Sequence, residues 1–581
     1  MRSRIVAGWT TAALLFAAGA ARAQPADTAA HLTVRAPAPG LELLATPADG
    51  PAYLFLRSQA RRLLSQRDYA GAEPLLAEVA RAYPRDGHNW MRLGHARAGL
   101  GQHRQAAEAF EHAGALLGWN YGMPGEPGIY AALSRVAAGD HPGALDLLRR
   151  LVFQERSIRR QALWELAGLA PLRGDPAFRE IAGRVDASGV DRVQGWRMDV
   201  DYLYHEVRRV NPDYHAAPFP AEVTRRYEQL KADVPRLSDE EIYVGMNRML
   251  APLRQGHTHL FIVPGDRWLP VRLYAFPEGL FIVQAAPGHE ALVGARVVAF
   301  GDVPADEVLR RAGQARNRDG DMELMWSVSD LASTYQLKGL GAIRQTESVT
   351  LTVQPPGGAV RRVTLPTGPA LAGRQDRLVP PPGVPAPLFL SRLDENHWEQ
   401  VLPEHNAVYV QMNNVSDDPD ETLAAFGQRL RIVLAESDPR TLVVDLRHNN
   451  GGSTNLYVEF LRTVVGFSAR PDKRVYVLIG RRTYSATGNL VTDLERLAFP
   501  FFAGEASSEC CHLNGDPSAV TLPYSGIQGE VTGMKWNLSG TVFDGRREMS
   551  PHVPVQLTAA DYFAGRDPVL DAVFAILHAA Q

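Results

Sequence analysis

Residues Thr441-Leu-Val-Val-Asp-Leu-Arg-His-Asn-Asn-Gly-Gly452 join an apolar run to a pair of glycines through a short polar stretch. A second segment, Val475-Tyr-Val-Leu-Ile-Gly-Arg-Arg-Thr-Tyr-Ser-Ala486, leads from an apolar run into a serine, after which helical spacing begins. Short apolar runs that alternate with helices are typical of strands buried in a parallel sheet with both faces covered. Because ligands bind at the carboxyl ends of such strands, the two segments predict an α/β core with a functional site near Gly452 and Ser485.

The sequence around these two segments continues the alternation. Residues 407–412 form another apolar run, and residues 421–434 and 487–497 carry helical spacing. Residues 388–578 are therefore predicted to form one α/β core, which a Pro-rich connection over 368–387 separates from the preceding part of the chain.

Two regions of different character precede the core. Residues 190–262 show helical apolar spacing and are predicted to be mainly helical. Residues 264–367 are instead rich in short β-type runs between Gly and Pro, with a helix expected near Asp306 and a closing hairpin at 349–365. This order of elements resembles a PDZ domain, a peptide-binding module, so a PDZ-like insert is expected at 264–367.

The segment 51–185 contains an internal repeat. Trp90-Met-Arg-Leu93-Gly94 is similar to the first-helix signature of the tetratricopeptide (TPR) repeat. Each helix pair of such a repeat exposes an apolar face that only its neighbour can cover. The pattern favours a TPR-like helical solenoid that binds a protein partner, and an ordinary helical bundle is the alternative. The repeating positions are Tyr69, Ala72 and Leu76, then His103, Ala106 and Phe110, then Ala144 and Leu148.

The first residues have the features of an export signal. Arg2 and Arg4 precede an apolar stretch, and Ala21-Arg-Ala23 supplies a small-residue cleavage pattern. We expect residues 1–23 to be a signal peptide, 24–50 to be a linker, and the mature bacterial protein to be periplasmic or secreted. A retained N-terminal anchor is the alternative. No later apolar run reaches the roughly 20 residues of a spanning helix, so no transmembrane segment is expected after signal removal.

Composition excludes several classes of protein. The net charge is −3 and no basic stripe stands out, so nucleic acid is not an expected partner. The two cysteines, Cys510 and Cys511, are adjacent, which excludes a disulfide framework and a thiolate metal site. They either close on each other or remain two thiols in a loop. No cofactor and no metal is predicted.

Ser485 is the first candidate for chemistry. A serine at the start of a helix is surrounded by free backbone N–H groups, which suit a developing oxyanion, although an isolated serine there is usually only a helix cap. Glycines such as Gly451 and Gly452 allow a backbone to approach a substrate, although they are also common in turns. The combination is more specific than either feature because a third element, Gly256-His-Thr-His259, accompanies it.

These segments, taken in order, resemble the S41 (tail-specific or C-terminal processing) peptidase family over residues 190–575. The motifs that carry the resemblance are Gly256-His257-Thr258, Asp445-Leu-Arg447-x-Asn449-x-Gly451-Gly452, Gly480-Arg-x-Thr483-Tyr484-Ser485-Ala486, Gly504-Glu505, Leu522-Pro-Tyr-Ser-Gly526 and Asp561-Tyr-Phe-Ala-Gly-Arg-Asp567-Pro-Val-Leu-Asp571. The resemblance implies a ClpP/crotonase-like core and a serine-type endopeptidase that acts on a polypeptide substrate. By position, Ser485 matches the nucleophile, and the N–H groups of Ala486 and Gly452 match the oxyanion donors.

The general base is where the sequence departs from the family pattern. Many members use a Lys about 25 residues after the serine, but the chain has only four lysines and none falls there. Members that resemble the tricorn core peptidase use a histidine, which here corresponds to His257. His512 is the alternative base, and Glu548 or Asp544 is expected to orient the imidazole.

Two other classes of function remain as alternatives. An intact serine with an unproven base also fits a catalytically inactive peptide-binding scaffold in which the TPR-like region does the biological work. A metallohydrolase that uses His257 and His259 would be sensitive to chelators, although the sequence shows no third ligand for a metal.

Overall fold

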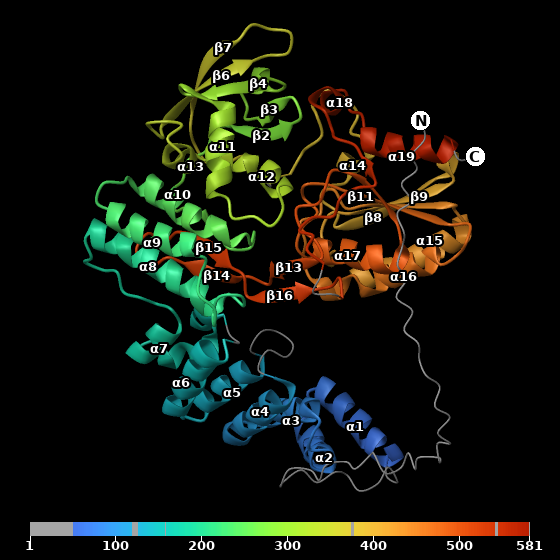
Figure 1. Ribbon diagram of the computed structural model, residues 1–581. Coiled ribbons are helices and arrows are strands. Elements are labelled where there is room, and N and C mark those ends of the chain that lie inside the picture. Colours follow the sequence, from blue (N-terminus) through green and yellow to red (C-terminus); the bar gives the residue numbers. More distant parts are fainter. Residues whose placement is uncertain (1–49, 119–125, 157–158, 374–376, 541–543, 580–581) are drawn as a thin grey trace, which may run out of the picture. The chain divides into compact units, whose positions relative to one another are not determined.

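The computed structural model describes residues 50–579 except 119–125, 157–158, 374–376 and 541–543 (Figure 1). The signal peptide predicted for 1–23 and nearly all of the linker predicted for 24–50 lie outside the described residues. The chain divides into two compact units, with the boundary after Leu117, and each unit is described separately. Among the described helices, none combines the length and apolar character that crossing a bilayer requires.

Among its described residues, the first unit consists of two helix pairs, α1 (Gly50–Ser65) with α2 (Tyr69–Ala82) and α3 (Gly87–Gly99) with α4 (His103–Leu117). The repeating apolar positions Ala72, Leu76, Ala106 and Phe110 are all buried. Gly94 is needed where the helices meet, because a Cβ there would lie 2.6 Å from the ring of Phe110. The TPR-like assignment itself stays a prediction.

The second unit begins with helices. The first group is α5 (Glu126–Ala137), α6 (His141–Arg149) and α7 (Pro176–Ile181), and the second is α8 (Arg192–Val210), α9 (Ala221–Asp233) and α10 (Asp239–Leu250). α10 starts at a capping box, in which Ser238 and Glu241 each accept a hydrogen bond from the other's backbone N–H. The boundary between the two units, after Leu117, falls inside the range 51–185 that is expected to form the helical repeats, because α5, α6 and α7 belong to the second unit.

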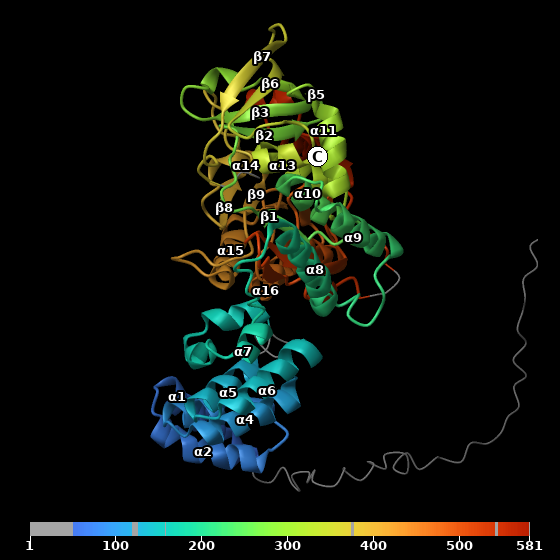
Figure 2. The same cartoon turned by 90° about the vertical axis from the view of Figure 1, so that its left-hand side faces the viewer.

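An antiparallel sheet follows, with strand order β2-β3-β4-β6-β7. Figure 2 shows β2, β3 and β6 in that order across the sheet, in which β4 lies between β3 and β6, with α11 (Ala305–Ala315) at one end of the strands. The strands of this region are β2 (Val271–Phe276), β3 (Gly279–Ala285), β4 (Arg296–Phe300), β5 (Val303–Pro304), β6 (Ser348–Gln354) and β7 (Arg361–Pro366). Its other helices are α12 (Met322–Trp326) and α13 (Thr334–Gly339). The expected helix near Asp306 and the closing hairpin are present, whereas identity as a PDZ domain stays a prediction.

The α/β core contains a second sheet, with strand order β17-β12-β11-β10-β9-β8, and only β8 runs antiparallel to its neighbour. Its strands are β8 (His397–Leu402), β9 (Ala407–Met412), β10 (Thr441–Asp445), β11 (Arg474–Ile479), β12 (Phe501–Gly504) and β17 (Val553–Pro554). Alternate residues of β9 and β10 face opposite sides of the sheet: Val408 and Leu442 pack among helices α15 (Leu423–Ser437), α16 (Val458–Ser468) and α17 (Ala486–Ala498), whereas Tyr409 and Val443 pack against α19 (Pro568–Ala579). The sheet is thus covered on both faces, as the apolar runs predict.

Part of the range predicted as one core, 388–578, leaves that sheet. β13 (His512–Gly515) pairs with β16 (Met534–Asn537), and β14 (Ser518–Thr521) with β15 (Gln528–Val531). β15 also pairs antiparallel with β1 (His259–Ile262), the strand that follows His257. The pairing holds the His257 region against the part of the chain that follows Ser485.

Candidate active site

Ser485 is held in a strained backbone conformation immediately before α17. Its φ of 56° and ψ of −126° are rare for a residue with a side chain, and such strain is found at functional sites when the surroundings enforce it. The surroundings do so here, because Thr483 Oγ1 bonds both the Gly480 N–H and the Leu446 carbonyl, at 3.1 Å each. The Ser485 hydroxyl makes no capping bond to the helix, so it is available for another role.

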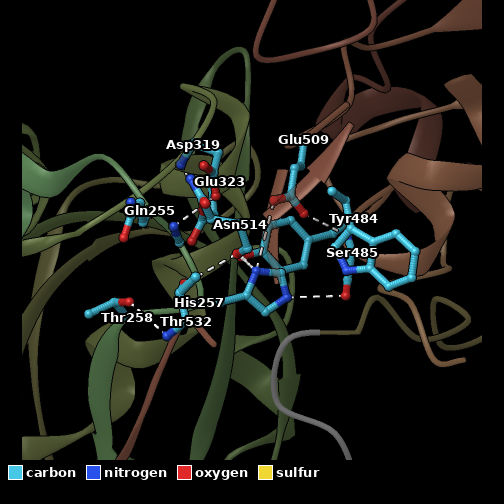
Figure 3. Close-up of polar contacts among 12 residues, drawn as sticks. Gln255, His257, Thr258, Asp319, Glu323, Tyr484, Ser485, Glu509, Asn514 and Thr532 are labelled. Carbon is cyan, nitrogen blue, oxygen red and sulfur yellow. Dashed lines mark hydrogen bonds and ion pairs between the residues drawn. The ribbon is translucent and has the colours of Figure 1, made fainter. Parts of the chain in front are cut away.

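His257 supplies the partner of that hydroxyl. Its Nε2 lies 3.1 Å from Ser485 Oγ, although the two residues are 228 positions apart in the chain (Figure 3). His257 belongs to a turn that a segment of the β-rich region holds in place. Gly256 N–H donates to Asp319 Oδ2 at 2.7 Å, and Asn317 Nδ2 donates to the Thr258 carbonyl at 2.8 Å. The structure therefore brings together the serine and the histidine that the sequence singled out.

The other ring nitrogen of His257 faces two groups. The hydroxyl of Tyr484 lies 2.8 Å from Nδ1, and the two rings stack at a centroid distance of 4.5 Å. Glu509 Oε1 lies 3.8 Å from the same nitrogen, while its Oε2 accepts a hydrogen bond of 2.9 Å from the Ser485 N–H. Tyr484 and Glu509 thus occupy the place that an orienting group needs.

Burial decides the protonation of these groups. It lowers the pKa of His257 to about 4, helped slightly by the charge of Arg316 and opposed by a hydrogen bond with the Asn514 backbone. Burial also raises the pKa of Asp319 to about 7, with a further contribution from the charge of Glu323. It raises the pKa of Glu509 well above its usual value, with Asp319 as the next cause. At neutral pH, His257 is therefore uncharged and able to accept a proton.

We expect the acid limb of the pH profile of kcat/KM to lie near pH 4, not near 6.5. The neutral imidazole is the active form, so activity is present above the lowered pKa of His257 and is lost as the pH falls through it. The profile should be measured with EDTA present. Circular dichroism at each pH is the control, because the unfolded chain protonates this histidine first and stability falls between about pH 6.5 and 4. An acid limb centred near 6.5 in folded protein would contradict the prediction.

The expected oxyanion donors lie in the two loops that flank the serine. Ala486 is the first residue of α17, and Gly452 ends the loop after β10. A Cβ built on Gly451 would lie 3.1 Å from Ser485 Oγ and 3.2 Å from the Ala486 nitrogen, so the glycine loop passes directly over the nucleophile. Within the described residues, the N–H groups of Gly452 and Ala486 donate to no backbone carbonyl. Both are available to an incoming substrate oxygen.

The structure places the other predicted site residues elsewhere. His512 lies on β13, where its Nε2 is 3.1 Å from the Ser539 hydroxyl. Asp544 is paired with Arg546 at 2.8 Å, and Glu548 lies beside Gly320. None of the three makes a hydrogen bond or ion pair with His257 in the described part of the chain. The place beside His257 that was expected for Glu548 or Asp544 is occupied by Tyr484 and Glu509, and Asp544 instead pairs with Arg546.

Sequence reasoning missed Glu509, Tyr484 and Asp319. Glu509 follows Ser485 by 24 residues, close to the position at which the family resemblance leads one to look for a lysine. That spacing was a usable signal, since a carboxylate at this position suits a histidine base. Asp319 has no comparable signal, because it lies in the β-rich region and meets the site only in the folded chain.

Cys510 and Cys511, which directly follow Glu509, form a disulfide between adjacent residues. Both are buried, and Cys511 N–H donates to Thr492 Oγ1 on α17 at 2.9 Å. Of the two forms that the sequence left open, the structure has the closed one. The disulfide fixes the backbone next to Glu509.

No family model matches this sequence, and no curated protein matches it. Among solved structures, mature CPAF complexed with lactacystin is 14% identical, over 66% of this chain and 98% of that one, with a TM-score of 0.49. The photosystem II D1 C-terminal processing protease is 15% identical, over 64% and 98%, with a TM-score of 0.33. A Bacteroides fragilis protein assigned to the S41 proteases is 14% identical, over 65% and 97%, with a TM-score of 0.30.

The likeness is to S41-type proteases. Because the identities lie below 25% and the TM-scores below 0.5, it transfers neither an activity nor the role of any residue to this chain. The function has to be inferred from Ser485, His257 and their neighbours.

Proposed function

We propose that this chain is a serine peptidase of the S41 type that cleaves polypeptides through an acyl-enzyme on Ser485. The observation that carries the proposal is the 3.1 Å contact between Ser485 Oγ and His257 Nε2. The nucleophile has a positive φ and the base is a histidine that burial keeps neutral. This is the arrangement that an activated serine requires, a hydroxyl in hydrogen-bond reach of a proton acceptor that a third group orients.

The proposed reaction follows from these positions. Ser485 Oγ forms a bond to the substrate carbonyl carbon while its proton passes to His257 Nε2. The N–H groups of Ala486 and Gly452 stabilise the negative oxygen. The amine then leaves with the proton from His257, and water hydrolyses the acyl-enzyme by the same steps in reverse.

Tyr484 acts as the positioning residue for this proton transfer. His257 Nε2 can accept a proton only in the tautomer that carries hydrogen on Nδ1, and the Tyr484 hydroxyl at 2.8 Å is placed to accept that hydrogen. When the ring becomes positive, this hydrogen bond becomes stronger. Glu509 contributes negative charge 3.8 Å from Nδ1 when it is ionised.

Tyr484→Phe is expected to lower kcat/KM by about tenfold to a hundredfold. Loss of a hydrogen bond to a charged group costs about 1.5–3 kcal/mol, whereas the phenylalanine ring keeps the stacking on His257. The measurement is kcat/KM as a function of pH, since the loss should accompany a shift of the acid limb. Tyr457→Phe, which removes a hydroxyl bonded to Asp493 at 2.8 Å, is the matched control. Equal effects of the two variants would contradict the role of Tyr484.

The flanking regions support a wider proposal. The helical repeats predicted at 51–185 are suited to binding a protein partner, and the β-rich region at 264–367 is suited to holding a substrate tail. The signal predicted at 1–23 places the activity in the periplasm or outside the cell. The substrates are then exported proteins or peptides.

Labelling with a fluorophosphonate probe tests the proposal. The full chain should label in proportion to its concentration and cleave an unstructured polypeptide such as casein, and Ser485→Ala should do neither. Ser468→Ala is the matched control, because in the part of the chain that the structure describes this hydroxyl bonds only the Val465 carbonyl on α16. An unlabelled, folded wild-type chain would contradict the peptidase proposal and favour the catalytically inactive scaffold.

A further inference from the structure

Three buried side chains from distant parts of the chain converge beside Ser485. His257, Asp319 and Glu509 each offer one ligand atom, and these atoms all lie within 4.8 Å of one another (Figure 3). The three residues are 5%, 4% and 0% exposed. A metal ion would need only small side-chain movements to contact all three.

The charge of this cluster is not balanced by protein cations. Arg316, whose charge acts on His257, is paired with Glu323 at 2.8 Å. Arg547, whose charge partly opposes the burial that raises the pKa of Asp319, makes no ion pair with the cluster among the described residues. In the described part of the chain, no Lys or Arg lies within 4.0 Å of the carboxylate of Asp319 or Glu509. Two buried carboxylates in such surroundings are costly unless a proton or a cation compensates them. One divalent ion would neutralise both.

Glu509 points an unused acceptor at the same place. Its Oε1 is buried and has no hydrogen-bond partner among the described residues. The same oxygen lies 3.8 Å from His257 Nδ1, so it faces into the cluster. Buried acceptors are nearly always satisfied in folded proteins, so either a proton shared with the Asp319 carboxyl or a cation bound between the two carboxylates fills this place.

We propose that His257, Asp319 and Glu509 bind a divalent transition-metal ion, with Zn²⁺ as the ion to test. One imidazole nitrogen with two carboxylate oxygens is a ligand set that Zn²⁺ accepts in a four-coordinate site. Ca²⁺ and Mg²⁺ prefer all-oxygen surroundings, so they are not expected to compete. The Tyr484 hydroxyl, 2.8 Å from Nδ1, or a water molecule can complete the coordination.

The bound ion inhibits the peptidase, an effect that rests on the proposed function. His257 must become positively charged when it takes the proton of Ser485. A ring that binds the ion through Nδ1 carries its remaining hydrogen on Nε2, which then has no lone pair to accept the proton of Ser485. Zinc therefore removes the base without contacting the nucleophile.

Calorimetric titration of ZnCl₂ into the full-length Ser485→Ala chain, stripped of metal with EDTA and then freed of EDTA, tests the site. We expect one equivalent to bind, and Asp319→Asn and Glu509→Gln each to weaken binding by about tenfold or more. Glu548→Gln is the matched control, since this carboxylate lies beside Gly320 but makes no contact with His257. Thermal unfolding checks that each variant is folded. Zinc binding that is absent, or unchanged in both ligand variants, would overturn the inference.

Two further measurements do not depend on the ligand variants. The visible spectrum of Co²⁺ bound to the Ser485→Ala chain should be that of a low-coordinate protein site, and the spectrum of hydrated Co²⁺ would overturn the inference. In the wild-type chain, zinc should block fluorophosphonate labelling and EDTA should restore it. Zinc that binds without changing the labelling would overturn the inhibitory effect. If the peptidase proposal itself is wrong, the result is different, because the wild-type chain then does not label with the fluorophosphonate even when it is free of metal.

Discussion

His257→Ala is expected to lower kcat/KM for polypeptide cleavage by about 10⁴-fold or more, a loss comparable to removal of the nucleophile. The serine hydroxyl is a poor nucleophile at neutral pH without a proton acceptor. His257 Nε2 is the acceptor that the structure places in reach of it, at 3.1 Å. Steady-state kinetics on a fluorogenic peptide measures the effect, and the initial rate of fluorophosphonate labelling should fall in parallel.

Two controls make the result specific to the role of His257. Added imidazole should restore part of the activity of His257→Ala, because it can enter the space that the missing ring leaves. His512→Ala should keep wild-type kinetics, since the His512 ring contacts Ser539 and lies on β13. If His512→Ala were inactive and His257→Ala active, the base would have been assigned to the wrong histidine.

Gly452→Ala is expected to lower kcat by about 10²–10³-fold, the loss that removal of one oxyanion donor produces. Gly452 has a φ of 142°, and a Cβ at this position would lie 2.1 Å from the Val415 carbonyl oxygen. The backbone must therefore shift, and its N–H moves with it. KM should change much less than kcat, because the donor acts on charge that develops in the transition state.

The control for Gly452→Ala is a glycine with free space around it. A Cβ added to Gly466, on α16, would meet no atom within 4 Å, so Gly466→Ala should leave both activity and stability intact. Thermal unfolding of Gly452→Ala separates a local effect from loss of the fold. A folded Gly452→Ala protein with wild-type kcat would show that this N–H does not stabilise the transition state.

The sequence predicts the strands of the α/β core well, because a run of almost only apolar residues is stable only when it is buried. Every residue of β9 and β10 is buried, and the runs 407–412 and 441–446 are apolar almost throughout. β14 and β15 are different. They are short and mixed in polarity, so nothing local distinguishes them from loops, and their pairing with β1 depends on contacts with a distant segment.

The same distinction applies to the site. Ser485 and the glycine loop stand out because strand ends and helix starts are local features. His257 was found only through a resemblance, since nothing in residues 256–259 alone shows that they face Ser485. Asp319 could not be found, because its role depends on a hydrogen bond of 2.7 Å to Gly256 that only the fold creates. Groups defined by long-range contacts lie beyond what periodicity and spacing can reveal.

The activation of Ser485 depends on the antiparallel pairing of β1 with β15, because this pairing holds the His257 region in place. A change that breaks the pairing of β1 with β15 is expected to move the His257 ring away from Ser485, while every reacting atom near 485 remains intact. The catalytic residues themselves would be unchanged in such a variant. The defect would be visible only in the register between β1 and β15.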